Sequence, residues 1–344
     1  MTLPSSSNRL WHRNEAVHAK NSDNMKNPLK RRTVGLPLAI DQMVEKRRNF
    51  FERYSAFRLC HHELSAHLTI DYYAGYLLCT YNQGFSLESL PATITELCRV
   101  LERSGLPVYG AVKKLRPENL SHGIDDQRSE IYRPRLVLGE MPPPRFIIKE
   151  NAWQFVVSFH EGHSTGLFLD IKPARRLVQQ MTGSQDEVLN LFSHTGGFSI
   201  AAATGGAGRV IEIDTGAKWL RWSRENQALN GVTVVRQRRE EAVHFLRKQK
   251  DASFDLIICD PPTYSTQKSG ARFTVAKIYQ AMLNDFYRVL RPHGHLLACT
   301  NYHALPRKKF FDLFVKKFKL AREIPISEDF VESDYLKIGL FKKT

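Results

Sequence analysis

The sequence predicts an α/β protein in which a parallel sheet covered by helices occupies roughly residues 146–344, preceded by a smaller α+β unit at residues 36–145. Three observations predict this arrangement. The C-terminal part repeats an order of apolar strand, glycine or proline turn and helix, which is typical of a doubly wound sheet. Residues 141–145 (MPPPR) separate the two parts, because prolines interrupt regular structure. The length of 344 residues also favours two folded units over one.

Composition limits the class of protein. No apolar run reaches the roughly 18 residues that span a bilayer, so we expect no membrane segment. The first residues lack the apolar centre of a secretory signal, which favours a cytoplasmic protein with reduced cysteines. The cysteines form no CxxC pair and no cluster with zinc spacing, so neither a disulfide nor a metal site is expected of Cys60, Cys79, Cys98, Cys259 and Cys299.

The formal net charge of +15 indicates a polyanionic partner, because clustered Lys and Arg bind a phosphate backbone by releasing its counterions. A basic surface that is merely solvated would give the same charge. Residues 1–35 leave the same two alternatives open. They are expected to form a flexible basic tail, and their Lys30-Arg31-Arg32 cluster either touches RNA or belongs to a solvated terminus.

The N-terminal unit reads as two helices and three strands. Apolar residues at helical spacing predict a helix over residues 36–57 and a second one over residues 87–104. Residues 67–81 read as a hairpin that turns near Ala74-Gly75. Residues 108–116 read as a short strand. Its cations, which either meet phosphates or are ordinary exposed charges, are Lys113, Lys114 and Arg116.

Two strand ends in the C-terminal part predict a nucleoside site. An apolar strand ends at Asn190–Phe192, and a turn with Gly196 and Gly197 leads into a helix, where an open α/β sheet binds its ligands. A glycine pair alone would also serve ordinary packing. The next strand closes with Asp214, about twenty residues on, which is suited to holding ribose hydroxyls. NAD would fit this spacing, but G-x-G-x-x-G is missing, which favours a cofactor with a ribose and no pyrophosphate.

A third strand end is the sharpest motif. Residues 254–264 (FDLIICDPPTY) are a buried strand that ends in Asp260-Pro261-Pro262 and, two residues on, Tyr264. A carboxylate and rigid carbonyls can accept hydrogen bonds from the exocyclic amine of a nucleobase, while an aromatic ring stacks on it. This motif predicts a pocket for a base, with a proline-terminated strand and a surface tyrosine as the alternative.

The chain resembles a family at these motifs. Four segments carry the resemblance: 164–170 (STGLFLD) followed by Arg175-Arg176, 189–199 (LNLFSHTGGFS), 219–231 (WLRWSRENQALNG) and 260–265 (DPPTYS). They are similar to the bacterial 23S ribosomal RNA methyltransferases of the class I, Rossmann-like fold, which make 5-methylcytosine or, in another branch, 7-methylguanine. The resemblance extends over most of residues 40–344.

The resemblance implies S-adenosylmethionine as cofactor and assigns residues to it. Asp214 would hold the ribose, and Glu241 stands where relatives usually carry an Asp facing the adenine. The full set implied for the cofactor is Phe168, Asp170, Asn190, Phe192, His194, Thr195, Gly196, Gly197, Asp214, Glu241 and Asp260, and the set for the target base is Asp260, Pro261, Pro262, Tyr264 and Asn301.

The base can be argued from nucleophile chemistry. Carbon-5 of cytosine becomes nucleophilic only after a cysteine thiolate adds to carbon-6. By the family resemblance, the 5-methylcytosine branch has Cys-Ser-Cys-Ser on the strand where this chain has Cys299-Thr300-Asn301. Asn301 occupies the position where that branch would have its second cysteine. Cys299 remains, but it lies in an apolar strand, which favours a buried thiol. The Thr300-Asn301 pattern and the DPPTY segment at 260–264, which has no lysine after the prolines, resemble the 7-methylguanine branch. Guanine N7 already presents a lone pair, so its methylation would need only in-line placement. Cytosine-C5 methylation through Cys299 remains the alternative.

The hypothesis is that Asp260 and Asn301 hold the guanine edge and Tyr264 stacks on it, while Lys268 and Arg272 either contact phosphates or form an exposed loop. The N-terminal unit, by its likeness to the family's small α/β unit, is expected to hold RNA. The expected substrate is 23S rRNA or a large-subunit assembly intermediate. A non-catalytic RNA-binding protein is a rival that the intact Gly196, Gly197, Asp214 and Asp260 argue against.

Overall fold

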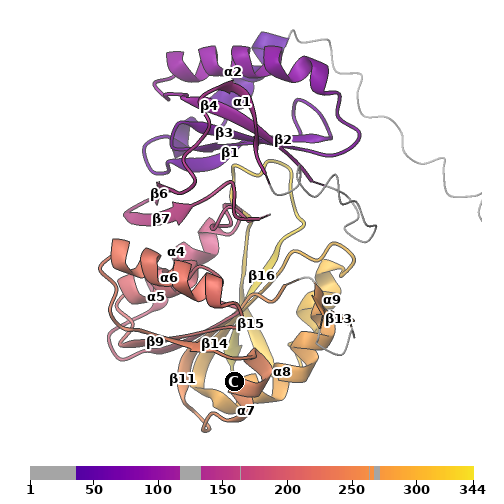
Figure 1. The fold of residues 1–344 in the computed structure, drawn as a ribbon. Coiled ribbons are helices and arrows are strands. Elements are labelled where there is room, and N and C mark those ends of the chain that lie inside the picture. The colour runs from indigo at the N-terminus through magenta and orange to yellow at the C-terminus, as the bar shows by residue number, and fades with distance from the viewer. Residues whose placement is uncertain (1–35, 117–132, 163, 263, 267–271) are drawn as a thin grey trace, which may run out of the picture.

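The structure is a computed structural model that describes residues 36–116, 133–162, 164–262, 264–266 and 272–344. The expected basic tail with its Lys30-Arg31-Arg32 cluster, and Lys268, lie outside these residues. The described residues form two large sheets stacked along one axis, the smaller built by the N-terminal part (Figure 1), and two two-stranded hairpins. Across the described residues, no helix has the length and apolar character needed to cross a membrane.

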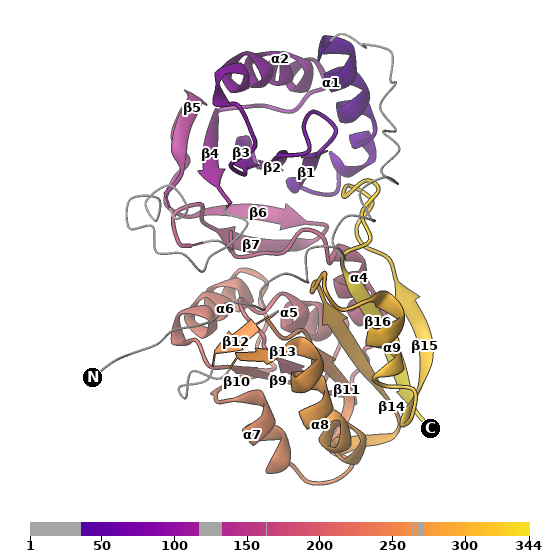
Figure 2. The same cartoon turned by 90° about the vertical axis from the view of Figure 1, so that its right-hand side faces the viewer.

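The N-terminal part is a five-stranded sheet in the order β1-β2-β3-β4-β5, with helices α1 and α2 on one face (Figure 2). The predicted hairpin is confirmed as β2–β3, whose turn residues Ala74 and Gly75 have φ of 46° and 95°. The helix and strand expected after it are confirmed as α2 and β4. The elements are α1 Leu36–Glu45, β1 Ala56–His61, β2 Leu68–Tyr73, β3 Tyr76–Tyr81, α2 Leu90–Arg103, β4 Gly110–Leu115 and β5 Arg135–Gly139.

The helix predicted for residues 36–57 is wrong beyond Glu45. The chain continues as a 3-10 turn over Arg48–Phe50 and enters β1 at Ala56. Arg47 explains the early end, because its buried guanidinium donates to the carbonyl oxygen of Met43 (3.2 Å) and to that of Arg58 (3.2 Å). A side chain thus satisfies a carbonyl that helix continuation would have used.

The C-terminal part is a seven-stranded sheet in the order β10-β9-β8-β11-β14-β16-β15. The first five strands are parallel and β16 is antiparallel to both neighbours, which confirms the predicted doubly wound sheet. Helices α4, α5 and α6 lie on one face and α7, α8 and α9 on the other (Figures 1 and 2). The elements are α4 Lys172–Met181, β8 Glu187–Leu191, α5 Gly197–Thr204, β9 Arg209–Asp214, α6 Ala217–Leu229, β10 Val235–Arg239, α7 Ala242–Arg247, β11 Phe254–Cys259, α8 Val275–Val289, β14 Leu290–Thr300, α9 Arg307–Asp312, β15 Phe318–Ile324 and β16 Lys337–Lys343, with a small hairpin of β12 Tyr264–Thr266 and β13 Arg272–Thr274.

The strand–turn–helix repeat does not begin at Phe146, as the sequence had indicated. Strands β6 (Phe146–Glu150) and β7 (Trp153–Val157) form an antiparallel hairpin of their own between the two sheets. The hairpin touches the N-terminal part through an isolated bridge between Tyr54 and Glu150. Its apolar side chains join one buried cluster that contains residues of both parts, so the two sheets share a core.

A segment from the far end of the chain also links the two parts. Residues 325–336, which we name the strap, connect β15 to β16 and rise to the N-terminal sheet (Figure 1). Within the strap, Asp329 is 1% exposed, and its Oδ2 accepts from the Arg58 backbone N–H and from Lys172 Nζ, both at 2.8 Å. Arg47 donates to its backbone oxygen (3.1 Å). Three segments far apart in sequence therefore meet at one buried carboxylate.

Candidate active site

The carboxyl ends of the parallel strands define the candidate site. From β8 the chain runs outward through β9 and β10, then returns to the other side of β8 as β11 and β14. In open α/β sheets such a reversal marks the crevice in which ligands bind, which here is expected beyond the ends of β8 and β11. Phe192, Asp214 and Asp260 directly follow or close β8, β9 and β11, so the structure brings the three sequence motifs to one edge.

The turn after β8 has a backbone that its packing enforces. Phe192, His194 and Gly196 have φ of 58°, 50° and 82°, which side chains other than glycine rarely adopt. A Cβ on Gly196 would lie 2.1 Å from the hydroxyl oxygen of Ser223 and 2.7 Å from Glu212 Oε1. The turn therefore requires glycine there on two counts, and it presents backbone N–H groups at the start of α5.

Asp214 ties this turn to the next strand end. Its Oδ2 accepts the backbone N–H of His194 (2.9 Å), and its Oδ1 accepts that of Gly216 (2.7 Å). Burial raises the pKa of Asp214, and the backbone donors oppose that shift. A half-buried carboxylate held at both oxygens keeps outward lone pairs with fixed directions, which suits a pair of ribose hydroxyls.

A loop before α4 forms one wall of the crevice, and its carbonyl groups are held by buried donors. Arg175 donates to the oxygen of Phe168 (2.9 Å) and makes a buried bidentate pair with Glu150 (2.6 and 2.7 Å). Lys172 donates to the oxygen of Leu169 (2.9 Å), and the Thr195 hydroxyl donates to that of Gly166. Three buried donors therefore hold the wall, and Arg175 also ties it to strand β6 through Glu150.

An aromatic row opens at the mouth of the crevice. The ring of Phe168, 48% exposed, lies 5.5 Å from that of His194, which lies 4.4 Å from Trp219. Burial, aided by Lys218, lowers the pKa of His194 to about 4, so its ring is neutral at physiological pH. An exposed phenylalanine beside neutral rings offers an apolar face to a planar ligand.

Two carboxylates face the other end of the crevice. Burial, and next the nearby charge of Asp170, raise the pKa of Asp260 to about 7, against the opposing charge of Arg175. Asp170 accepts a hydrogen bond from the Tyr335 hydroxyl (2.7 Å), and the Tyr335 ring stacks on His303 at 5.4 Å. Tyr335 carries no signal in the sequence, because the strap on which it lies has no motif and meets Asp170 only in the folded chain.

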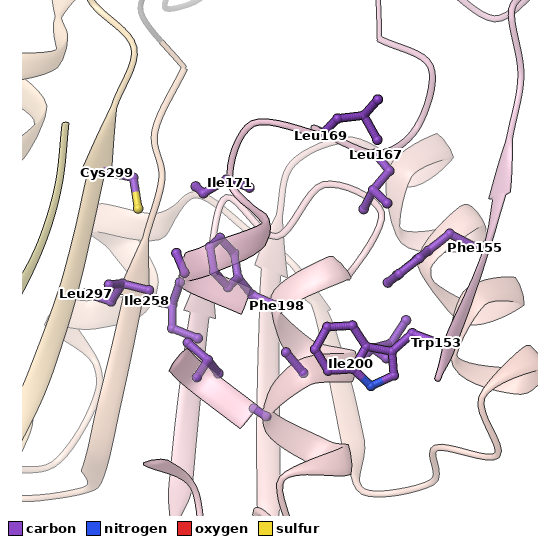
Figure 3. Close-up of a cluster of buried hydrophobic side chains, with 14 of the residues drawn as sticks. Trp153, Phe155, Leu167, Leu169, Ile171, Phe198, Ile200, Ile258, Leu297 and Cys299 are labelled. Atoms are coloured by element: carbon purple, nitrogen blue, oxygen red, sulfur yellow. The ribbon is translucent and has the colours of Figure 1, made fainter. Parts of the chain in front are cut away.

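Cys299 is enclosed in the sheet. It has no exposed surface, and Figure 3 shows it among apolar side chains of the shared core that include Ile258 and Leu297. Burial and the neighbouring Asp260 raise the pKa of the Cys299 thiol well above its usual value. Its backbone N–H and oxygen both bond the hydroxyl of Tyr279, at 3.0 and 2.7 Å. Asn301 comes two residues later, exposed at the carboxyl edge.

The remaining expected site residues lie in different surroundings. Asn190 is buried and donates to Ser199 (2.9 Å), so it supports the glycine turn from below. Glu241 is exposed at the start of α7, beyond β10, and Pro261 is buried beside exposed Pro262. Lys114, suggested for phosphates, is buried and donates to the oxygens of Phe159 (2.9 Å) and Gly162 (2.6 Å), which corrects that suggestion. The side chains of Tyr264 and Arg272 lie outside the described residues.

The chemistry of the crevice fits S-adenosylmethionine. Asp214 and the Gly196 turn suit a ribose, while Asp170 and Asp260 suit the cationic sulfonium and ammonium groups. Beneath the turn, the buried Ser193 hydroxyl oxygen has no hydrogen-bond partner in the described structure. A family model described as S-adenosylmethionine-dependent methyltransferase matches residues 47–334. The chain belongs to this family.

Relatives of this methyltransferase carry related names. It is 31% identical over 295 residues to the putative ribosomal RNA large subunit methyltransferase YwbD of Bacillus subtilis, covering 80% of this chain and 71% of that one. It is 31% identical to ribosomal RNA large subunit methyltransferase I of Aeromonas salmonicida (71% and 60% covered) and 33% identical to ribosomal RNA large subunit methyltransferase K/L of Alcanivorax borkumensis (54% and 26% covered). The resemblance to a large-subunit rRNA methyltransferase family is thereby confirmed, as is the cofactor.

A solved structure agrees in fold with the methyltransferase. The crystal structure of SMU.776, a putative methyltransferase complexed with SAH, superposes with a TM-score of 0.74 at 23% identity and covers 89% of this chain and 80% of that one. The predicted class I fold is confirmed.

Proposed function

We propose that this methyltransferase modifies a base of large-subunit ribosomal RNA, and that the base is guanine, methylated at N7. The names of its relatives and the net charge of +15 support an rRNA substrate. The sealed environment of Cys299 carries the choice of base, because cytosine-C5 chemistry needs an accessible thiolate. In this role, residues 36–145 would hold the RNA, and residues 146–344 would form the methyltransferase unit.

S-adenosylmethionine, held by Asp214, Glu241, the Phe192–Gly197 turn and the wall at Phe168–Asp170, would supply a methyl group that a nucleophile displaces from its sulfonium sulfur. Asp260 and Asn301 would hold the guanine edge by hydrogen bonds so that the N7 lone pair points along the displacement line. No proton is transferred, and the purine gains a positive charge. The carboxylates of Asp170 and Asp260 would favour that developing cation.

The deciding experiment uses labelled S-adenosylmethionine with unmodified 23S rRNA, and in parallel with an immature large-subunit particle, followed by nuclease digestion and mass spectrometry. Label in 7-methylguanosine is expected. Label in 5-methylcytidine would replace this proposal with the Cys299 mechanism. Cofactor binding without label on either substrate would exclude both as substrates, and no cofactor binding would remove the enzymatic role of the site.

A cysteine substitution separates the two bases. We expect Cys299→Ser to keep the rate of methyl transfer within about twofold of the parent, since direct transfer to N7 uses no thiol. The matched control is Cys259→Ser, because Cys259 is equally buried on the adjacent strand β11 and is likewise bonded by Tyr279 (2.8 Å). The covalent mechanism is correct if Cys299→Ser abolishes methyl transfer, Cys259→Ser transfers methyl groups at the parent's rate, and the two variants have the same melting curve.

The titration of Asp260 predicts a pH profile. With a pKa of about 7, its acceptor form predominates only above that pH. We therefore expect kcat/KM, which reports the free enzyme, to rise with pH through about 7 and to fall about tenfold per pH unit on the acid side. Asp260→Asn should lower the plateau and remove this titration. A wild-type profile that is flat between pH 6 and 8 would contradict the role of the carboxylate.

A further inference from the structure

One edge of the large sheet carries a group of arginines that the site does not use. Arginines dominate the cations there: residues 219–239 contain five arginines and no lysine. All five side chains are exposed, and none forms an ion pair with a carboxylate of the described chain. We name the group the arginine edge: Arg221, Arg224, Arg236, Arg238 and Arg239.

Neighbouring arginines behave differently. Arg145 pairs with Glu161 (2.9 Å) and Glu225 (2.6 Å), and Arg209 pairs with Glu187 (2.5 Å). By contrast, the arginine edge bonds only neutral groups: Arg224 donates to the Gln237 side chain (2.9 Å) and Arg238 to a backbone oxygen (3.3 Å). These guanidinium groups thus keep most of their donors free for an external anion.

The arginine edge forms one surface over two elements. Arg221 and Arg224 lie one helical turn apart on the exposed face of α6, and Arg224 reaches Gln237 on β10. On β10, the outermost strand, Arg236 and Arg238 point to one side of the sheet and Arg239 to the other. Figure 2 shows α6 beside β10, so the charges wrap around the sheet border.

This surface begins at the crevice. Arg239 pairs in register with Asp214, and its Nε donates to the oxygen of Thr215 (3.1 Å), the residue that follows Asp214. The carboxyl end of β10 therefore lies at the same border as the proposed cofactor site. Glu240, the next acid along the chain, is occupied by Lys248 (2.7 Å) and His244 (3.0 Å).

An alternative explanation for the cations on β10 is that charged side chains on an edge strand prevent it from pairing with a strand of another molecule. The opposite edge shows how this chain does that: residues 307–322, which include α9 and most of β15, contain five lysines and two arginines. Lys319 on β15 pairs with Lys342, far from the carboxyl ends of the parallel strands. Arginine instead of lysine, at the border next to the site, favours bidentate binding of phosphates.

We propose that the arginine edge binds the phosphates of the RNA strand flanking the target base, so that the strand leaves the crevice across β9 and β10. This inference rests on the proposed function for its RNA ligand. Its variant is Arg221→Gln/Arg236→Gln/Arg238→Gln, which leaves Arg239 at the site untouched. The matched control removes three cations from the opposite edge: Lys316→Gln/Lys319→Gln/Arg322→Gln.

Affinity for an unmodified 23S rRNA transcript is measured by filter binding at several KCl concentrations. The logarithmic salt slope of the arginine variant is expected to fall by about 2, since each lost phosphate contact removes roughly 0.7 to 0.9. Its KM for RNA should rise about tenfold or more with kcat and cofactor affinity unchanged. The control should keep the parent's slope.

A parental slope in the arginine variant, an equal loss in the control, or no RNA binding by the parent would overturn the inference. The outcome for the proposed function is separate. Methyl transfer by the parent with an unchanged arginine variant would refute the arginine edge alone. A reduced slope in the variant without methyl transfer by the parent would refute the proposed function alone.

Discussion

Asp260→Ala is expected to lower the rate of methyl transfer about a hundredfold or more, with the protein folded. A carboxylate that receives hydrogen bonds from the base and faces a developing cation contributes on the scale of an oxyanion-hole donor. The variant should not lose stability. The pKa of Asp260 is raised to about 7, so its charged form is disfavoured in the folded state and its removal relieves that burden at neutral pH.

Single-turnover methyl transfer and thermal unfolding test this prediction together. A rate within twofold of the parent would refute the assignment of Asp260 to the base pocket. Asp260→Asn is the companion variant, since it keeps the shape and part of the hydrogen bonding while losing the charge. A melting temperature well below that of the parent in the alanine variant would mean that Asp260 is structural.

Gly196→Ala is expected to abolish measurable binding of S-adenosylmethionine and to lower the free energy of unfolding by about 2–4 kcal/mol. The added Cβ would lie 2.1 Å from the Ser223 hydroxyl oxygen, and the backbone φ of +82° adds its own strain. Ser223 cannot move freely, because its hydroxyl donates to the buried Glu212 (2.9 Å). The turn must therefore shift, and the N–H groups aimed at the cofactor shift with it.

Gly105→Ala is the matched control. Gly105 has the same φ of +82°, but its added Cβ would meet nothing within 4 Å. It should cost only about 1 kcal/mol and leave cofactor affinity unchanged. Urea unfolding and titration calorimetry measure both quantities. Equal losses in the two variants would show that backbone conformation, and not crowding at Ser223, determines the effect.

Sequence patterns predicted the parts of the molecule whose cause is local. The Ala74-Gly75 turn, the Gly196 turn and the strand before Asp260 each carry their reason within a few residues. The errors occurred where distant contacts prevail. Arg47 falls within the helix predicted for residues 36–57 but is buried at a three-segment junction. Lys114, expected either to meet phosphates or to be an exposed charge, is buried and donates to the carbonyl oxygens of Phe159 and Gly162.

Tyr335 and Asp329 could not be predicted for the same reason. Tyr335 bonds Asp170, and Asp329 bonds Lys172, Arg58 and Arg47, all at least 157 residues away in sequence. The strap that carries them has neither helical nor strand periodicity. Only the assembled sheet order, with β16 inserted between β14 and β15, shows where the strap goes.

The strap limits how such a chain can diversify. Exchange of its N-terminal unit for another module would remove Arg47 and the Arg58 donor, leaving Asp329 with Lys172 as its remaining donor. A buried carboxylate deprived of donors is strongly destabilising. The loss would also reach Asp170, which the strap holds through Tyr335 and through the Ser327 N–H (2.9 Å). New specificity is therefore expected to arise by appending domains at the chain ends and not by replacing the unit already there.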